Sequence, residues 1–192
     1  MLIFFFKSIQ FFIIGIFVVF ISDFRNKSGM VPIINEKITS LLKISYLVPL
    51  GIFVDILIFM DNLTYFTFLG LFLTVLGTAI TVKAKYDLRT HHTWIGYCKD
   101  SSILITTGIY SYVRHPLYTG ICLFMIGGLI AAIPNTTLLV SILFTIIIIY
   151  IMSFLAILAS KETKHLQKTA GQDFLRYQKE VHPVFPIKKY SR

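Results

Sequence analysis

The longest uncharged stretch of the chain begins at Pro116, and it is directly preceded by Arg114 and His115. Proline suits the first turn of a helix, because its missing N–H is not needed there. The free N–H groups of such a turn, together with the helix dipole, attract an anion. Arg114 adds a permanent positive charge on a planar group that can bind a carboxylate or a phosphate at two points. This segment is therefore a candidate anion-binding site.

Aromatic and acidic residues extend the chemistry that this segment could perform. Tyr110, Tyr112 and Tyr118 offer aromatic faces that suit a flat base or a cation. Glu162 offers a carboxylate for an ammonium group. A ligand with an aromatic base, a carboxylate, an ammonium and a sulfonium would match these features, and S-adenosylmethionine is such a ligand. The alternative is that the arginine and the tyrosines are ordinary residues of a membrane interface, where such side chains are common.

The composition indicates that helices crossing a membrane must position these residues. Hydrophobic residues make up 56% of the chain and charged residues only 14%, against about 25% charged in a soluble domain. Since about 20 apolar residues span the hydrocarbon core as a helix, we expect an all-α, multi-pass membrane protein that forms one embedded domain over residues 1–192. About five spans are expected, over residues 2–22, 42–60, 63–82, 116–133 and 136–160. The polar segment before the second span includes a short amphipathic start to that span.

Basic residues predict the orientation of the bundle. Five spans place the two ends of the chain on opposite sides of the membrane, and 17 of the 18 lysines and arginines then fall on one side. Basic loops favour the cytosolic face, so we expect the N-terminus outside or in a lumen and the C-terminus in the cytosol. A bacterial inner membrane and the endoplasmic reticulum fit equally well. The net charge of +9 is then mostly a matter of topology, with membrane lipids as partners and no nucleic acid required.

The fourth and fifth expected spans form a hairpin that carries the chain out and back. Helices joined by a short turn are antiparallel neighbours, so we expect Arg114 and His115 to face Glu162 in one cytosolic pocket. Beyond the hairpin, apolar residues recur at steps of three and four, which predicts a cytosolic amphipathic helix that stops near His182, before Pro183. Its stripe either lies on the membrane surface or packs over the mouth of the bundle. The stripe consists of Leu166, Ala170, Phe174, Tyr177 and Val181.

Two ordered motifs give the chain a resemblance to a known family. The first is GIYSYVRHPLY, from Gly108 to Tyr118, and the second is ETKHLQKTAGQDFLRYQKEVHPVFP, from Glu162 to Pro186. Over about residues 76–188 the chain resembles the isoprenylcysteine carboxyl methyltransferase family and the related phospholipid N-methyltransferases. The resemblance implies a membrane-embedded methyltransferase without a Rossmann domain, whose cofactor, S-adenosylmethionine, enters from the cytosol. The implied acceptor is a lipophilic or prenylated small molecule, and we expect it to enter sideways from the bilayer, where an amphiphile already partitions.

The resemblance also implies roles for individual residues. The segment from Ser102 to Ile105 would contact the adenosine mostly through its backbone, and Glu162 would bind the methionyl ammonium. Residues around the Arg-His-Pro motif would line the rest of the cofactor. The full set of expected cofactor-binding residues is Ser102, Ile103, Leu104, Ile105, Tyr110, Arg114, His115, Pro116, Leu117, Tyr118 and Glu162.

The chain departs from the family pattern around Glu162. Carboxyl-methylating members have an arginine in the turn before the glutamate, for the carboxylate of their substrate, whereas this chain has Leu158 at the matching position. Thr163 stands where the second glutamate of the motif would be. A prenylcysteine substrate is therefore in doubt, and methylation on oxygen, nitrogen or sulfur stays open.

Two other functions stay open on the sequence. Sterol reductases share a similar Arg-His-Pro-like C-terminal half, so a lipid reductase that uses NADPH is the first alternative. Such enzymes usually have more than five spans, and the 2′-phosphate of NADPH would require more cations around its pocket. A small non-enzymatic membrane protein is the second alternative, and it would bind neither ligand.

Several further residues within the expected spans have open or structural roles. Asp55 lies inside the second span, where an ionisable residue is a functional candidate. It could contact the acceptor, bond to a neighbouring helix or lie near the outer interface. Gly120, Gly127 and Gly128 are expected to allow close helix packing. We expect no metal site, because the two adjacent histidines of the loop at His91 rarely bind one ion.

Overall fold

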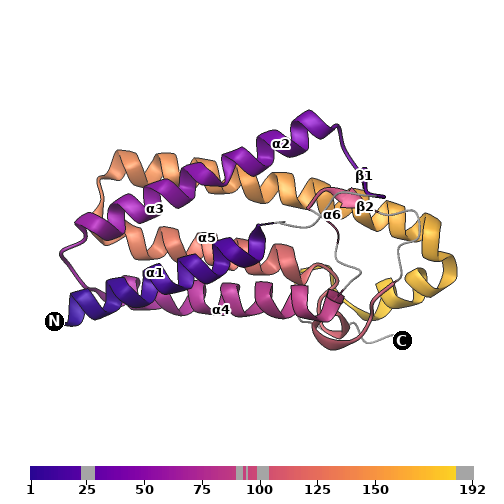
Figure 1. The fold of residues 1–192 in the computed structure, drawn as a ribbon, viewed down its shortest axis with the longest axis horizontal. Helices are drawn as coiled ribbons and strands as arrows, with labels where there is room; N and C mark the ends of the chain where they lie inside the picture. The colour runs from indigo at the N-terminus through magenta and orange to yellow at the C-terminus, as the bar shows by residue number, and fades with distance from the viewer. Residues whose placement is uncertain (23–28, 90–92, 94, 99–103, 185–192) are drawn as a thin grey trace.

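Five helices that are long and apolar enough to cross a membrane run through the molecule (Figure 1). This count refers to the residues that the structure, a computed structural model, describes, which are 1–22, 29–89, 93, 95–98 and 104–184. The spans are Leu2–Ile21, Glu36–Phe59, Tyr65–Leu88, Pro116–Asn135 and Leu138–Glu180. The predicted all-α, multi-pass membrane architecture is confirmed. The N-terminus lies at the left end of Figure 1, and α4 ends and α5 begins at the right end, which we call the site end.

The second span is made of two helices, α2 (Glu36–Ser45) and α3 (Leu47–Phe59), which meet at Tyr46. The helix begins at Glu36 and not near residue 42, because Asn35 caps it. The Asn35 side chain accepts a hydrogen bond from the backbone N–H of Lys37 at 2.9 Å, which satisfies one of the free donors of the first turn. The amphipathic start expected for this span is α2, and the junction places Tyr46 beside the core of the bundle.

The helices α4 (Tyr65–Leu88) and α5 (Pro116–Ala132) pack backbone against backbone. A Cβ atom on Gly77 would lie 2.6 Å from the carbonyl oxygen of Gly120. A Cβ atom on Gly127 would lie 2.7 Å from the backbone nitrogen of Thr74. Both distances are too short for a real side chain, so only glycine permits this approach. Small residues commonly bring membrane helices together in this way, and the packing role predicted for Gly120 and Gly127 is confirmed.

Polar contacts attach α1 (Leu2–Ile21) to its neighbours. Gln10 is fully buried and accepts a hydrogen bond of 3.0 Å from the hydroxyl of Thr74 on α4. Near the N-terminal end, the ammonium of Lys7 donates to the carbonyl of Ile58 on α3 at 2.8 Å. A polar group inside a membrane is costly unless it finds a partner of this kind. These two bonds therefore fix α1 against both α4 and α3.

The last helix, α6 (Leu138–Glu180), does not end near residue 160 as expected but continues into the tail. At about 1.5 Å per residue, the part before Gly171 is roughly 50 Å long. This length exceeds the hydrocarbon core of a bilayer, which is about 30 Å thick. The turns around Glu162 therefore belong to a helix that extends past the core. Similarly, α4 continues to Leu88, beyond the expected end of the third span at residue 82.

A bend at Gly171 turns the end of α6 back over the site end of the bundle (Figure 1). Gly171 has φ 50° and ψ −123°, a conformation that is accessible to glycine and costly for other residues. Of the two placements expected for the stripe, packing over the bundle mouth is the one that the contacts with Leu104 and Tyr110 support. The apolar cluster consists of Phe174, Tyr177 and Val181 with Leu104, Leu166 and Ala170 around them.

Short elements connect the helices at both ends of the bundle. At the site end, β1 (Val31–Pro32) pairs antiparallel with β2 (Tyr97–Cys98), which joins the segment before α2 to the loop after α4. The short helix η2 (Gly108–Ser111) then leads into α5. At the other end, η3 (Ile133–Asn135) makes the turn between α5 and α6. The side chain of Asn135 exchanges two hydrogen bonds of 3.1 Å with the backbone of Asn62, and these hold the two turns of that end together.

Candidate functional site

Glu162 on α6 is the centre of a polar cluster at the start of α5. The hydroxyl of Tyr118 donates a hydrogen bond to its Oε1 atom. The Nδ1 atom of His115 lies 3.4 Å from its Oε2 atom. The sequence predicted that the hairpin of α5 and α6 would bring the Arg-His-Pro segment and Glu162 into one pocket. Of Arg114 and His115, which were expected to face Glu162, the structure confirms this for His115, and Tyr118 is an additional contact.

His115 is held at both of its ring nitrogens. While Nδ1 faces Glu162, Nε2 lies 3.3 Å from the hydroxyl of Thr163, the next residue along α6. The ring also stacks on Tyr118, with a centroid distance of 5.7 Å and an angle of 8° between the planes. His115 is buried, whereas the Glu162 side chain is 23% exposed. The imidazole is therefore a fixed wall of the site, and the carboxylate is the group that a ligand can reach.

The turn before α5 is built around Asp87, near the end of α4. Its carboxylate accepts a hydrogen bond of 2.8 Å from the backbone N–H of Ile109 and a charge-assisted one of 2.6 Å from Lys83. Gly108 has φ +63°, and a Cβ atom there would collide with the Asp87 carboxylate. Glycine is thus required at this position for two reasons, its conformation and its closeness to Asp87. The arrangement sets the path along which η2 delivers Tyr110 and Arg114.

Four residues of the tail, 181–184, lie against the start of α5, and we call them the tail strap. Their backbone carbonyls face the donors of the Arg-His-Pro segment. The N–H groups of Arg114 and His115 donate to the carbonyls of His182 and Pro183 at 3.0 and 2.9 Å. Val113 and His182 form a parallel β-bridge at the same place. The tail strap therefore fixes the backbone immediately before Pro116.

Arg114 contacts the tail strap and not Glu162. Its Nε atom donates to the carbonyl of Val181 at 3.1 Å. Burial lowers the pKa of Arg114 from its usual value, while the neighbouring Tyr177 acts in the opposite direction. Within the described part of the chain, its terminal Nη1 atom is buried and has no hydrogen-bond partner. A buried guanidinium nitrogen without a partner is costly, so this atom is available for an anionic ligand.

Tyr110 links η2 to the tail. It is buried, and its carbonyl accepts a hydrogen bond of 2.6 Å from the hydroxyl of Tyr177. Burial first, and the nearby Glu162 carboxylate second, raise the pKa of the Tyr110 hydroxyl well above its ordinary value. Tyr110 therefore keeps its proton at neutral pH and can act as a neutral aromatic wall or as a hydrogen-bond donor or acceptor.

Only some of the other predicted site residues lie near the cluster. Pro116, Leu117 and Tyr118 are buried in the first turn of α5. Leu104 packs against the tail cluster, and Ile105 is partly buried beside it in the chain. Ser102 and Ile103 lie outside the described residues, as do His91 and His92. Among the described residues, no group of three or more histidine, cysteine, aspartate or glutamate side chains could hold a metal ion.

Two predicted contributors lie away from the cluster. Tyr112 is 59% exposed, so it adds no buried aromatic face. Asp55 is exposed on α3, four residues before the end of that helix, on the side of the turn that Asn62 and Asn135 hold together. The structure therefore does not bring Asp55 to the site end.

Some residues of the cluster were not expected from the sequence. Thr163 was identified only as a departure from a motif, although its position next to Glu162 could have suggested a contact with the same partner. Asp87 gave no signal, because a carboxylate at a helix end is usually solvated. The tail strap acts through backbone carbonyls, which side-chain chemistry cannot predict.

The cluster fits a ligand that carries both a cation and an anion. The carboxylate of Glu162 keeps acceptor capacity beyond the bonds to Tyr118 and His115, since two carboxylate oxygens offer about four lone-pair sites. The Nη1 atom of Arg114 and the first turn of α5 offer donors for an anion. The buried rings of Tyr110 and Tyr118 supply flat apolar surface in the same region. These features are what the ammonium, carboxylate and adenine groups of S-adenosylmethionine would require.

Comparison with known proteins supports this interpretation at the level of the family. The family model described as phospholipid methyltransferase matches residues 65–173, which is more than half of the chain. The matched region begins with α4 and ends just after the bend at Gly171, so it contains Glu162 and the start of α5. A comparison with curated proteins found no match.

Proposed function

The chain belongs to the phospholipid methyltransferase family, a family of membrane methyltransferases, and from this premise we propose that it transfers a methyl group from S-adenosylmethionine to a lipophilic small acceptor. The observation that carries the proposal is the convergence of Tyr118 and His115 on Glu162. This carboxylate is partly exposed at the end of an apolar bundle, where a cation from the aqueous side can reach it.

We assign the cofactor to the cluster as follows. Glu162 binds the methionyl ammonium, with Tyr118 and His115 holding the carboxylate in place. Arg114 binds the methionyl carboxylate through its free Nη1 atom, while its Nε atom stays on the tail strap. Tyr110 and the segment that includes Leu104 and Ile105 cover the adenosine. Under this proposal the site end faces the cytosol, in agreement with the basic residues of its loops.

The bound cofactor supplies a methyl group on a positively charged sulfur. With the cofactor held by Glu162 and Arg114, its sulfonium would give the methyl group to a lone pair of the acceptor atom and leave as the neutral thioether of S-adenosylhomocysteine, and any proton on the acceptor would pass to water at the mouth. No group of the protein has to form a covalent bond. The protein contributes by holding the two ligands in line and by excluding water, which are large effects for a reaction of two bound molecules. The buried His115 and Tyr118 rings provide this fixed, dry wall.

A thermal-shift experiment on the purified protein in detergent tests the cofactor class. S-adenosylhomocysteine is expected to raise the melting temperature, because a ligand that binds only the folded state stabilises it. NADPH at the same concentration is expected to leave it unchanged. A shift with NADPH alone would make the protein a reductase, and no shift with either ligand would favour a non-enzymatic role.

A transfer experiment then tests the reaction. The protein is incubated with S-adenosylmethionine labelled in its methyl group and with a panel of lipids, prenylated thiols and quinol-like phenols. We expect the label in at least one lipophilic product, identified by mass. Label in none of them, from a protein that binds S-adenosylhomocysteine, would refute a lipophilic acceptor while leaving the cofactor site intact.

A further inference from the structure

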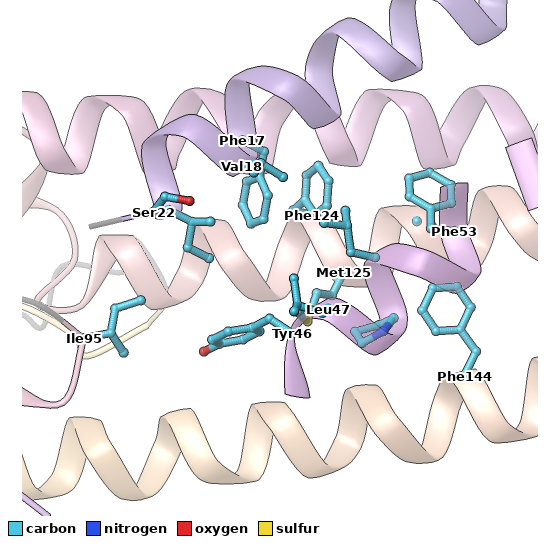
Figure 2. A pocket seen from close by; sticks show the side chains of 14 residues that line it. Phe17, Val18, Ser22, Tyr46, Leu47, Phe53, Ile95, Phe124, Met125 and Phe144 are labelled. Atoms are coloured by element: carbon cyan, nitrogen blue, oxygen red, sulfur yellow. The ribbon is translucent and has the colours of Figure 1, made fainter. Parts of the chain in front are cut away.

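A cavity of about 310 Å³ lies between the N-terminal helices and α5 (Figure 2). Its lining comes from α1, from α3 and its junction with α2, from α5 and α6, and from Ile95 in the loop after α4. Figure 2 shows Phe17 and Val18 of α1 beside Phe124 of α5, with Tyr46 and Leu47 below them and Phe144 of α6 at the lower right. Its walls are almost wholly apolar, and none of the 14 lining residues is charged.

One polar group in this cavity lacks a partner. The hydroxyl oxygen of Tyr46, at the junction of α2 and α3, is buried and makes no hydrogen bond within the described residues. A buried hydroxyl without a partner destabilises the folded state, because it has given up its hydrogen bonds to water. In Figure 2 the Tyr46 hydroxyl points in the direction of Ile95, toward the end of the cavity that Ser22 also lines. The orphan hydroxyl thus lies toward the site end of the cavity.

The cavity and the cofactor cluster are neighbours. Phe124 and Met125, which line the cavity, lie about two turns along α5 from Tyr118, which donates to Glu162. Tyr46 packs against the same apolar core as Tyr118. A molecule in the cavity with its polar end beside Tyr46 would therefore present that end toward the cluster. The remainder of the molecule would lie among apolar side chains such as Phe17, Phe124 and Met125.

We propose that this cavity binds the methyl acceptor, that the acceptor is a neutral lipophile with a single chain, and that the Tyr46 hydroxyl makes a hydrogen bond to its head group. The inference rests on the proposed methyltransferase function and names the substrate class for it. It makes Tyr46 a residue that determines acceptor specificity. The chain can be isoprenoid, alkyl or acyl, since its recognition is by apolar contact alone.

Volume and charge select this class of acceptor. Ligand pockets in proteins have volumes of about 300–1,000 Å³, so the cavity is at the small end and suits one chain better than the two of a phospholipid. A charged head group would need a counter-charge when buried, and the lining offers none. The family resemblance would place an arginine for a carboxylate at the position of Leu158. Leu158 is fully buried. It packs near Gly96, since a Cβ atom added to Gly96 would lie 3.5 Å from the Leu158 side chain. An anionic acceptor therefore finds no partner there.

The location of the cavity agrees with a role in specificity. Part of its lining comes from α1 and from the junction of α2 and α3, which precede the matched residues 65–173. The cofactor cluster lies within those residues. A division of this kind leaves the cofactor chemistry in the matched region and builds the acceptor cavity in part from helices that the family model does not cover.

A pair of adjacent variants tests whether the cavity is the site. Val18 lines the cavity, whereas Val19, the next residue of α1, is 59% exposed on the outside of the helix. Val18→Trp fills the cavity, and Val19→Trp makes the same change on the outer face. The probe is an alkylphenol with a photoreactive diazirine in its chain, and the readout is the labelled peptide found by mass spectrometry. We expect labelling on residues of α1, α3 or α5 that line the cavity, its loss in Val18→Trp and its retention in Val19→Trp.

Competition defines the class of ligand. Unlabelled alkylphenol and a neutral prenylated thiol are expected to suppress the labelling, whereas phosphatidylethanolamine with two acyl chains is not. Suppression by phosphatidylethanolamine to the same extent, or equal labelling of the two tryptophan variants, would overturn the proposal.

A second pair of variants tests the head-group contact. Tyr46→Phe removes only the orphan hydroxyl, and Tyr150→Phe makes the same change on an exposed face of α6. Loss of one hydrogen bond worth about 1 kcal/mol predicts roughly fivefold weaker binding of the alkylphenol in Tyr46→Phe and no change in Tyr150→Phe. An alkylbenzene probe, which lacks the hydroxyl, is expected to bind both variants equally. Equal affinity of alkylphenol for Tyr46→Phe and the unaltered protein would refute the contact.

Binding of S-adenosylhomocysteine is measured in each of these variants. It is expected to stay unchanged, because none of the altered residues belongs to the cofactor cluster. Failure of the acceptor proposal then appears as unaltered probe labelling with normal cofactor binding. Failure of the proposed function appears as a lack of cofactor binding in the unaltered protein.

Discussion

The helix α5 has two sides that are packed in opposite ways. Toward α4 it has glycines, and the two backbones approach so closely that no added Cβ atom would fit. Toward α1 and α3 it has Phe124 and Met125, and a cavity of about 310 Å³ remains between the helices. One helix therefore joins the most tightly packed part of the described structure to one of its most open parts.

This contrast indicates that the rigid part of the molecule and the part that selects the acceptor lie on different sides of α5. The tight side lies within the family match and carries the turn that places His115 and Tyr118 against Glu162. A cofactor site gains from such rigidity, since small displacements of groups that hold a reactant reduce catalysis. The open side binds by apolar contact, which selects a ligand by its shape and does not distinguish an isoprenoid from an alkyl or acyl chain. Under our proposal the first side binds the shared cofactor and the second binds the acceptor.

The largest effect is expected from a side chain added at the close contact between α4 and α5. In Gly120→Leu the new Cβ atom meets the Thr81 hydroxyl and the carbonyl of Gly77. Overpacking of this kind costs typically about 1–3 kcal/mol and more when backbone must move. We expect a large fall in the melting temperature in detergent and loss of S-adenosylhomocysteine binding. The control is Gly51→Leu on α3, where an added Cβ atom has nothing within 4 Å. Equal melting temperatures of the two variants would contradict the packing argument.

Removal of the charge at Glu162 tests the site without disturbing the packing. Glu162→Gln keeps the shape of the side chain and its oxygen for Tyr118, yet loses the charge that would bind an ammonium. A hydrogen bond to a charged group is worth about 1.5–3 kcal/mol, so S-adenosylhomocysteine is expected to bind roughly 10–100-fold more weakly. Isothermal titration measures this, with Glu180→Gln at the exposed end of α6 as the control. Unchanged affinity in Glu162→Gln would remove Glu162 from the cofactor site.

The tight side of α5 was largely predictable from the sequence. Gly120 and Gly127 lie within an apolar run, and this pattern predicts close helix packing. The charge-free hairpin required that Glu162 return to the level of His115, and the stripe around Phe174 and Tyr177 predicted an amphipathic tail helix, with its packing partner left open. Each of these conclusions follows from periodicity or chain length, which the sequence displays directly.

The remaining features depend on contacts between distant segments. Arg114 was expected to bind a ligand with its whole fork, yet the tail strap takes up its Nε atom. Asp55 was a candidate because charges within spans are rare, but it lies exposed toward the other end of the bundle. The cavity beside Tyr46 exists because the side chains of α1, α3 and α5 do not fill the space between these helices. No local pattern records such a mismatch in packing.

The hydrogen bond between Tyr177 and the carbonyl of Tyr110 offers a milder test of the tight side. It ties the tail helix to η2 at 2.6 Å. Tyr177→Phe keeps the apolar contacts of the tail cluster and is expected to cost about 1 kcal/mol of stability, because the buried carbonyl loses its donor. We expect faster amide exchange in the tail strap and a few-fold weaker S-adenosylhomocysteine binding, with acceptor-probe labelling retained. The control is Tyr112→Phe, which removes an exposed hydroxyl in the same region. Identical amide exchange in both variants would show that the tail is held without this bond.

The smallest expected effect belongs to Thr163, which faces His115 from the side opposite Glu162. Its hydroxyl lies 3.3 Å from Nε2, so it helps to keep Nδ1 turned toward the carboxylate. Thr163→Val preserves the shape and removes the bond, and we expect S-adenosylhomocysteine to bind about threefold more weakly, equivalent to roughly 0.5–1 kcal/mol. Thr163→Ser restores the hydroxyl and is expected to restore the affinity. A merely structural threonine would instead show loss in the serine variant, which lacks the methyl group, and none in the valine variant. That outcome would place the orientation of His115 under the control of Tyr118 alone, through the stacking of their rings.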